Sequence, residues 1–341
     1  MLTEIFGKPS AGALTAIRDE ALLGARRVGD VVVDALGRER VDLVWASVLS
    51  THLAGHQLWD GSQVGEEAWQ AAGLAGALRD VYAAADAALG RIVDALPDDA
   101  DLIVCSPQGM GANTSRVDLL PGMLTAVLGE RGAEDDTGGG IWRFRASIPT
   151  SARAAVSRAL PEGVVRGLYA SLAVRGIDWS RTRAFALPAD HFGHVQLNVR
   201  GRERDGVVDP AEADELADRI AAGLLTFRDE DGGTAVDSVV RVARELDGPG
   251  VAALPDLVVR WSERPAAGLR AVVSPEHGTV RRVGAGSGRS GGHTSEAWAL
   301  VRPGRSRLLA EGDGRVVDVA ATACALLGAD GTGLPGTPLL G

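Results

Sequence analysis

The 341-residue sequence is poor in cysteine and has no excess of positive charge. Its two cysteines, Cys105 and Cys324, lie in apolar segments, where we expect buried free thiols and no disulfide framework. The net charge of -10 disfavours binding to nucleic acid or to an anionic membrane surface. No signal peptide is evident at the start, and no window reaches the roughly 18 apolar residues of a membrane span. These absences predict a cytoplasmic protein.

What the sequence does contain is a large apolar fraction, 45% of all residues, arranged as alternating helical and strand-like segments. Helical periodicity covers about residues 11–38 and again about 65–96. Short apolar runs at Asp42–Ser50 and Asp101–Ser106 have the character of buried parallel strands. A strand, a long helix and a second strand predict a βαβ unit, so that the loops after both strands open on the rim where α/β proteins bind ligands.

The second half of the sequence predicts a mixture of short strands and helices. Asp209 and Pro210 suit the first turn of one helix, as cap and first helical residue. The expected elements are a helical stretch at about 151–172, two strands within 183–208, the helix at about 209–227, a strand at Pro255–Trp261, an apolar run at 297–301 and a helix at 316–329.

Three of the six histidines stand where they could bind a metal ion. His52 and His56 are four positions apart, which places them on one face if the segment is helical. His293 lies in a glycine-rich loop, "GSGRSGGHTSEAW", whose glycines allow the backbone to approach a ligand closely. Taken alone, each signal is also compatible with a solvated histidine in a surface turn.

Several blocks of sequence, in order, resemble a known family. They are "WASVLSTHLAGHQLWD", "DLIVCSPQGMG", "GIDWSRTRAFALP", "VQLNVRGRERDGVV", "LPDLVVRW", "GGHTSEAWALVRPG" and "VVDVAATACALLGADGTGLPGTPL". Together they are similar to the later portion of the alkaline phosphatase superfamily, in its branch of type I phosphodiesterases and nucleotide pyrophosphatases. The resemblance implies a three-layer α/β/α sandwich with a mostly parallel sheet, N-terminally truncated, formed as one domain by residues 1–341. An inserted subregion could occupy about 145–185.

The same resemblance implies a zinc site and a departure from the family pattern. The first zinc site of the family corresponds to His52, His56 and His293, with an imidazole at position 52 in place of an aspartate. The second needs an Asp-His pair where this sequence has Pro107 and Gln108, and the family's nucleophile belongs to an N-terminal portion that this sequence lacks. We therefore expect one zinc ion and no two-metal mechanism.

Two functions follow from these features. The first is a divergent metal-dependent hydrolase that acts on a phosphodiester, a nucleotide-like phosphoester or a related small anionic substrate. The second is a catalytically inactive pseudoenzyme that acts as a binding or scaffold subunit. Because a sheet without its N-terminal strands would expose an edge, a homodimer or an N-terminal partner chain could complete either one.

The remaining candidates have plainer alternatives. Asp60, close to Trp59, could orient a ligand imidazole, although a helix-capping acid explains it as well. The basic run Arg200–Gly206 could contact phosphate or form a solvated hairpin. The other candidates are rim residues that could polarise a substrate or water, and histidines in turns: Ser106, Gln108, Asn113, His191, His194 and His277.

Overall fold

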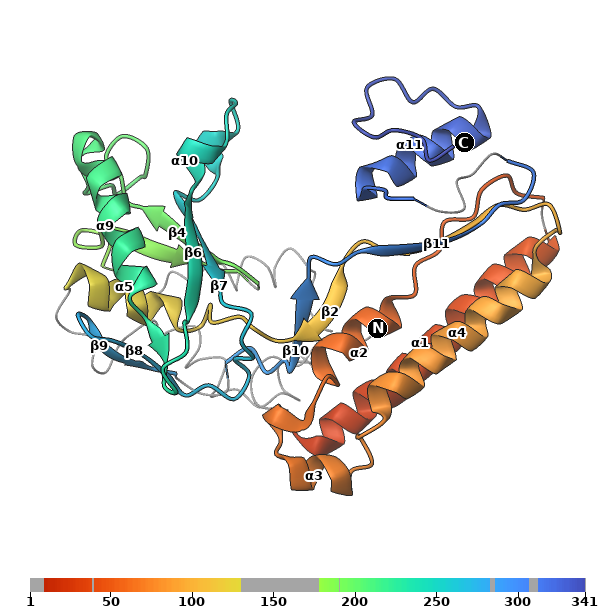
Figure 1. The fold of residues 1–341 in the computed structure, drawn as a ribbon, viewed down its shortest axis with the longest axis horizontal. Helices are drawn as coiled ribbons and strands as arrows, with labels where there is room; N and C mark the ends of the chain where they lie inside the picture. The colour runs from red at the N-terminus through yellow and green to blue at the C-terminus, as the bar shows by residue number, and fades with distance from the viewer. Residues whose placement is uncertain are drawn as a thin grey trace.

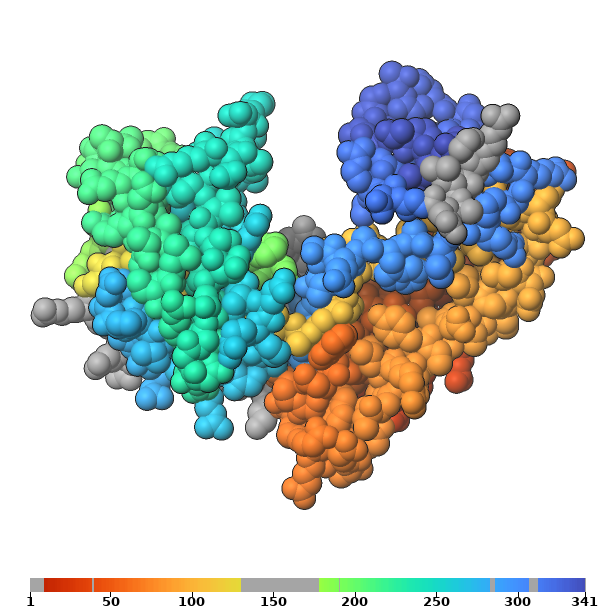
Figure 2. All heavy atoms as spheres, in the orientation of Figure 1, coloured from red at the N-terminus to blue at the C-terminus, as the bar shows by residue number. Residues whose placement is uncertain are grey.

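In the computed structural model, the described residues are 9–38, 40–129, 178–189, 191–282, 286–306 and 312–340. They form a helical lobe and a sheet lobe that meet at a narrow neck (Figures 1 and 2). The helical lobe consists of α1 (Ala11–Arg38), α2 (Leu49–Gln57), α3 (Glu66–Ala71) and α4 (Ala77–Ala95). Two further pieces, the 3-10 turn η1 (Gly61–Gln63) and the C-terminal helix α11 (Val316–Leu327), lie on the same side of the neck.

Helix α1 confirms the helix predicted at 11–38. Its buried residues recur at helical spacing and form one stripe, which packs against α4 and α2. Gly29 lies on this stripe, and a side chain there would come within 2.9 Å of the Ala88 Cβ atom, so the two long helices approach closely. The core of the lobe contains Leu14, Ile17, Ala21, Ala54, Leu58, Trp69, Leu74, Ala77 and Val81.

The sheet lobe has a four-stranded antiparallel sheet in the order β3-β4-β7-β6. Its strands are β3 (Ala184–Leu187), β4 (Gly193–Leu197), β6 (Val236–Arg241) and β7 (Leu257–Trp261). Helices α5 (Leu120–Leu128) and α9 (Ala213–Leu225) share its core. The remaining elements are a small sheet of β5 (Arg228–Asp229), β8 (Ala271–Ser274) and β9 (Gly278–Arg281), the helix α10 (Val242–Glu245), and the 3-10 turns η2 (Pro210–Glu212) and η3 (Val251–Ala253).

Several predicted elements are confirmed in this lobe. The strand expected at Pro255–Trp261 is β7, and the two strands expected within 183–208 are β3 and β4. Asp209 caps the following helical segment, because its carboxylate accepts a hydrogen bond from the Ala211 N–H at 2.9 Å.

Two antiparallel ribbons form the neck and its extension. Strand β2 (Gly109–Ala112) pairs with β10 (Gly291–Thr294), and β1 (Leu102–Ser106) pairs with β11 (Trp298–Arg302). The chain leaving β2 is fixed to the sheet lobe by buried ion pairs. Arg116 binds both carboxylate oxygens of Asp229 at 2.9 and 2.7 Å, and Arg282 binds Asp118 at 2.6 Å. The neck therefore has a firm anchor on one side.

The predicted three-layer sandwich with a mostly parallel sheet is wrong. All pairings between named strands in the described part of the chain are antiparallel, in sheets of two to four strands. The strand expected at Asp42–Ser50 does not form. Residues 41–48 are mostly exposed without helix or strand, and α2 begins at Leu49. An apolar run without periodicity does not identify its partner, and β1 pairs with β11 rather than with this segment.

Cys105 is exposed, contrary to prediction, because β1 belongs to a two-stranded ribbon with little cover, while Cys324 is half-buried; both thiols are free. The helix expected at 151–172, and most of the subregion at about 145–185, lie outside the described residues. Among the helices that are described, none combines the length and the apolar character needed to cross a bilayer.

Candidate metal centre

Helix α2 places His52 and His56 on one face. The segment contains no proline, and the Leu58 N–H closes its last turn by donating to the Ala54 carbonyl at 2.7 Å. Because the two histidines are four residues apart, their side chains project from successive turns toward the β2/β10 ribbon. His52 is half-buried and His56 is 3% exposed.

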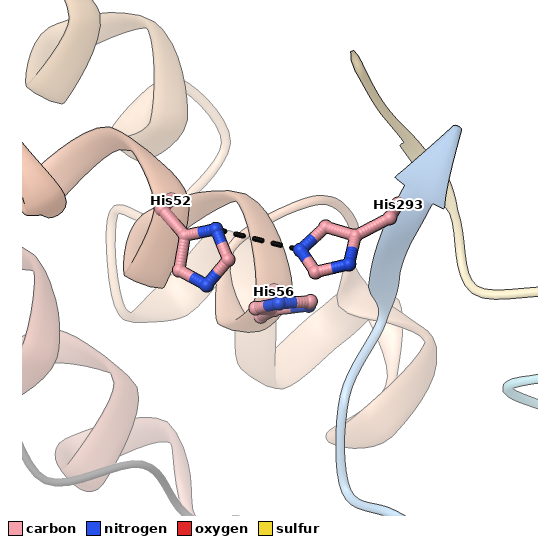
Figure 3. Close-up of side chains that lie close together, drawn as sticks. All are labelled: His52, His56 and His293. Atoms are coloured by element: carbon pink, nitrogen blue, oxygen red, sulfur yellow. Dashed lines mark hydrogen bonds between the residues drawn. The ribbon is translucent and has the colours of Figure 1, made fainter. Parts of the chain in front are cut away.

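Strand β10 brings His293 to the same place from the far end of the sequence (Figure 3). Gly291 makes this approach feasible, since a methyl group at position 291 would overlap the Gly55 carbonyl oxygen of α2. The Ser290 N–H also donates to the His56 carbonyl at 3.0 Å. Gly291 therefore allows strand β10 to approach helix α2 closely.

The three imidazoles surround one point. Their ring centroids are 4.7 Å apart for His52 and His56, 4.7 Å for His56 and His293, and 5.0 Å for His52 and His293. One ligand nitrogen from each ring lies within 4.8 Å of the other two. With zinc–nitrogen bonds of about 2.0–2.1 Å and tetrahedral angles, two imidazoles that share an ion have centroids about 5 Å apart. The observed spacing fits such an ion without large movement.

The protonation of His56 favours metal binding. Its Nδ1 lies 3.1 Å from the Gly291 carbonyl oxygen, which can only accept, so Nδ1 carries the proton and Nε2 keeps its lone pair. Burial lowers the pKa of His56 to about 4, opposed by the hydrogen bond to the Gly291 carbonyl and helped by the positive charge of Arg289. The imidazole is therefore neutral at neutral pH.

His52 and His293 face one another. The Nε2 atom of His293 lies 3.4 Å from the Nδ1 atom of His52, the contact drawn dashed in Figure 3. In the absence of an ion one nitrogen donates to the other. A cation at this point would be held by one lone pair from each ring, so the two rings would no longer bond to one another.

The loop before β10 is held by buried amides. Asn113 donates to the Arg289 carbonyl at 2.9 Å and to the Ser287 hydroxyl at 3.2 Å, and Gln63 donates to the Arg289 carbonyl at 3.5 Å. The rim position predicted for Asn113 is thus a supporting position beneath the histidine loop. Arg289 itself is 8% exposed and places a positive charge near His56.

A fourth histidine, which the sequence indicated only weakly, lies beside the site. The His191 ring centroid is 6.5 Å from that of His293, and His191 packs edge-on against Phe192 with centroids 4.5 Å apart. Burial lowers the pKa of His191 as well. A histidine in a turn just before a strand was the only sequence signal for it, and that pattern does not indicate which distant residues it meets.

The other predicted candidates have local roles. The Ser106 hydroxyl donates to the Gln108 carbonyl at 2.7 Å within the turn after β1, and Gln108 is exposed. Asp60 caps η1 by accepting from the Ser62 N–H at 2.9 Å, which is the plainer of its two interpretations.

The last three candidates lie in the sheet lobe. In the run Arg200–Gly206, Arg202 binds both oxygens of Asp256 at 2.7 Å, so this basic segment forms an ion-paired turn. His277 stacks on Phe227 with centroids 6.2 Å apart. His194 lies on β4, opposite Leu187 and Val258, and burial lowers its pKa.

A cavity of about 590 Å³ lies near the centre, although none of the three histidines lines it. One lining residue, Met110, pairs with His293 across the β2/β10 ribbon. Three aromatic side chains also line the cavity, although aromatic residues make up only 4% of the chain: Trp59, Tyr82 and Trp298. They are 37%, 44% and 50% exposed, so all three are accessible to a ligand.

Comparisons with protein-family models, with curated proteins and with solved structures found no match for this chain.

Proposed function

We propose that this protein is a zinc-dependent hydrolase of phosphoesters, with a single ion held by His52, His56 and His293. The observation that carries the proposal is the meeting of three imidazoles, from two segments more than 230 residues apart in sequence, at the spacing that one ion requires. A zinc ion with three histidine ligands keeps a fourth position open and lowers the pKa of a water molecule there to about 7.

The charges around the centre favour an anionic substrate. Arg289 contributes a buried positive charge close to His56, and the neutral imidazoles do not cancel the charge of a divalent cation. A phosphoester oxygen is attracted to such a site, which would hold it beside the open coordination position. The likeness of the sequence blocks to phosphodiesterases supports the same class of substrate.

The cavity beside Met110 offers a place for the remainder of the substrate. Trp59, Tyr82 and Trp298 provide ring faces and edges, which favour a planar aromatic ester group over a simple alkyl one. Because Met110 belongs to both the cavity and the ribbon that carries His293, one molecule could place its phosphate at the centre and its substituent in the cavity.

Hydrolysis of an aryl phosphodiester and an aryl phosphomonoester by the zinc-loaded protein tests this proposal. We expect turnover of at least one ester that disappears in His56→Ala and His293→Ala, and survives in the control His194→Ala, which removes a histidine from β4. Turnover that is unchanged in both His56→Ala and His293→Ala would refute the assignment of these histidines to a catalytic zinc site.

A binding or scaffold protein is the second candidate. The turn Ser106–Gln108 favours it, because the Ser106 hydroxyl donates to the Gln108 carbonyl and the segment Ser106–Gln108 provides no second set of metal ligands. This alternative predicts stoichiometric zinc with no hydrolysis of either ester, so the same experiment separates the two functions.

A further inference from the structure

His191 approaches the metal centre from a different part of the fold. It lies in the turn before β4, in the sheet lobe, whereas His52 and His56 belong to α2 in the helical lobe. Its ring is half-buried and is held edge-on by Phe192. Of the three histidines of the centre, His293 is the one whose ring it approaches, at 6.5 Å between centroids.

This distance is too long for a shared ion. The three ligand pairs are separated by 4.7 to 5.0 Å, near the value of about 5 Å for two imidazoles on one tetrahedral cation. Even two imidazoles on opposite sides of a zinc ion would have centroids only about 6.4 Å apart. His191 is therefore not a fourth ligand in this arrangement.

The distance does fit one atom placed between His191 and the ion. A group at the open coordination position lies about 2 Å from the ion, and a hydrogen bond of about 2.8 Å then reaches an imidazole nitrogen. We propose that His191 hydrogen-bonds to an oxyanion oxygen, of the phosphate class, that occupies the fourth coordination position of the His52/His56/His293 centre. This inference rests on the proposed metal site and names a positioning residue within it.

Two features of the surroundings support this role. A neutral imidazole has one N–H donor, so it can bind an anionic oxygen without adding a charge that repels the cation. Arg289, on the loop before β10, adds the positive charge that an anion requires. The anion would then be held between the two lobes, by α2 and β10 on one side and the turn before β4 on the other.

The test uses the full chain loaded with Co²⁺, titrated with inorganic phosphate and followed by the visible absorption of the metal. We expect His191→Ala to weaken phosphate binding by about tenfold or more, which is the effect of losing a hydrogen bond to a charged group. Metal affinity and the spectrum without phosphate should stay within about twofold of the wild type. His191→Asn, which restores a side-chain donor, should recover part of the affinity, and His194→Ala should behave as the wild type.

Other outcomes would overturn the inference in distinguishable ways. Phosphate affinity that is the same in His191→Ala and the wild type, or no phosphate binding by the wild type, removes the proposed contact while leaving the metal site intact. A tenfold loss of Co²⁺ affinity in His191→Ala would make His191 a direct ligand instead. Failure of the wild type to bind Co²⁺ would remove the proposed function together with this inference.

Discussion

Replacing Gly291 by alanine tests whether the contact between strand β10 and helix α2 builds the centre. The added methyl group would overlap the Gly55 carbonyl oxygen and lie 3.1 Å from the Trp59 Cβ atom. To relieve this overlap, α2 and β10 must separate by roughly 1 Å or more, which is enough to break hydrogen bonds between them. The bonds at risk are His56 Nδ1 to the Gly291 carbonyl and the Ser290 N–H to the His56 carbonyl.

The magnitude follows from these two losses. Overpacking at a rigid contact costs about 1–3 kcal/mol, and each lost hydrogen bond costs about 1 kcal/mol. We expect Gly291→Ala to lower the free energy of unfolding by about 3–5 kcal/mol. Zinc affinity should fall about 10- to 100-fold, the usual effect of removing the partner that orients a ligand histidine.

The next residue provides a matched control. A methyl group at Gly292 would find its nearest neighbour, the Asn113 Cα atom, at 3.4 Å, which is an ordinary contact. Urea unfolding of both variants, with zinc affinity measured against a coloured chelator, makes the comparison. If Gly291→Ala matches Gly292→Ala in both stability and zinc affinity, the reasoning about this contact is wrong.

Three further predictions concern protonation, packing and the substrate. Because the pKa of His56 is about 4 in the folded chain and 6.5 in an unfolded one, the unfolded chain binds more protons between these pH values, so the free energy of unfolding of the metal-free protein should decline as pH falls from about 6.5 to 4. Urea titrations at several pH values should show a smaller decline in His56→Asn. Asp229→Asn should destabilise the protein by about 3–5 kcal/mol, because it leaves the buried Arg116 without its charged partner, whereas Asp30→Asn at the exposed pair with Arg91 should change stability by less than about 1 kcal/mol. Equal losses of stability in thermal unfolding would contradict the argument from burial. Tyr82→Ala should raise the KM for an aryl phosphodiester several-fold and leave the KM for a dimethyl phosphodiester unchanged, since a ring contact contributes about 1 kcal/mol. A parallel change in both KM values would mean that the aryl group does not contact Tyr82.

Local features of the fold could be predicted from the sequence. The helix at 11–38 has an apolar stripe of helical period, and the segment after Asp209 has a capping residue followed by proline, so both elements follow from short-range chemistry. Strand partners could not be predicted in this way. The run Asp42–Ser50 is apolar enough for a buried strand, but pairing depends on which strand arrives beside it, and β1 pairs with β11 from nearly 200 residues later.

The candidate site was likewise only partly predictable from the sequence. The spacing of His52 and His56 indicated a shared face, although the sequence suggested a turn or helix equally. The pairing of His293 with them came from the resemblance of sequence blocks, and the structure places all three rings together. The proximity of His191 depends on how the turn before β4 packs against the neck, which no local pattern encodes.

The zinc content of the purified protein tests the central claim most directly. After removal of metal and equilibrium dialysis against a small excess of zinc, the account predicts about one tightly bound ion per chain in the wild type and in His194→Ala. It predicts a loss of tight binding in His52→Ala, His56→Ala and His293→Ala, each of which must remain folded by circular dichroism. A wild-type chain that retains no zinc, or a His293→Ala variant that retains it fully, would contradict the claim that these three imidazoles share an ion.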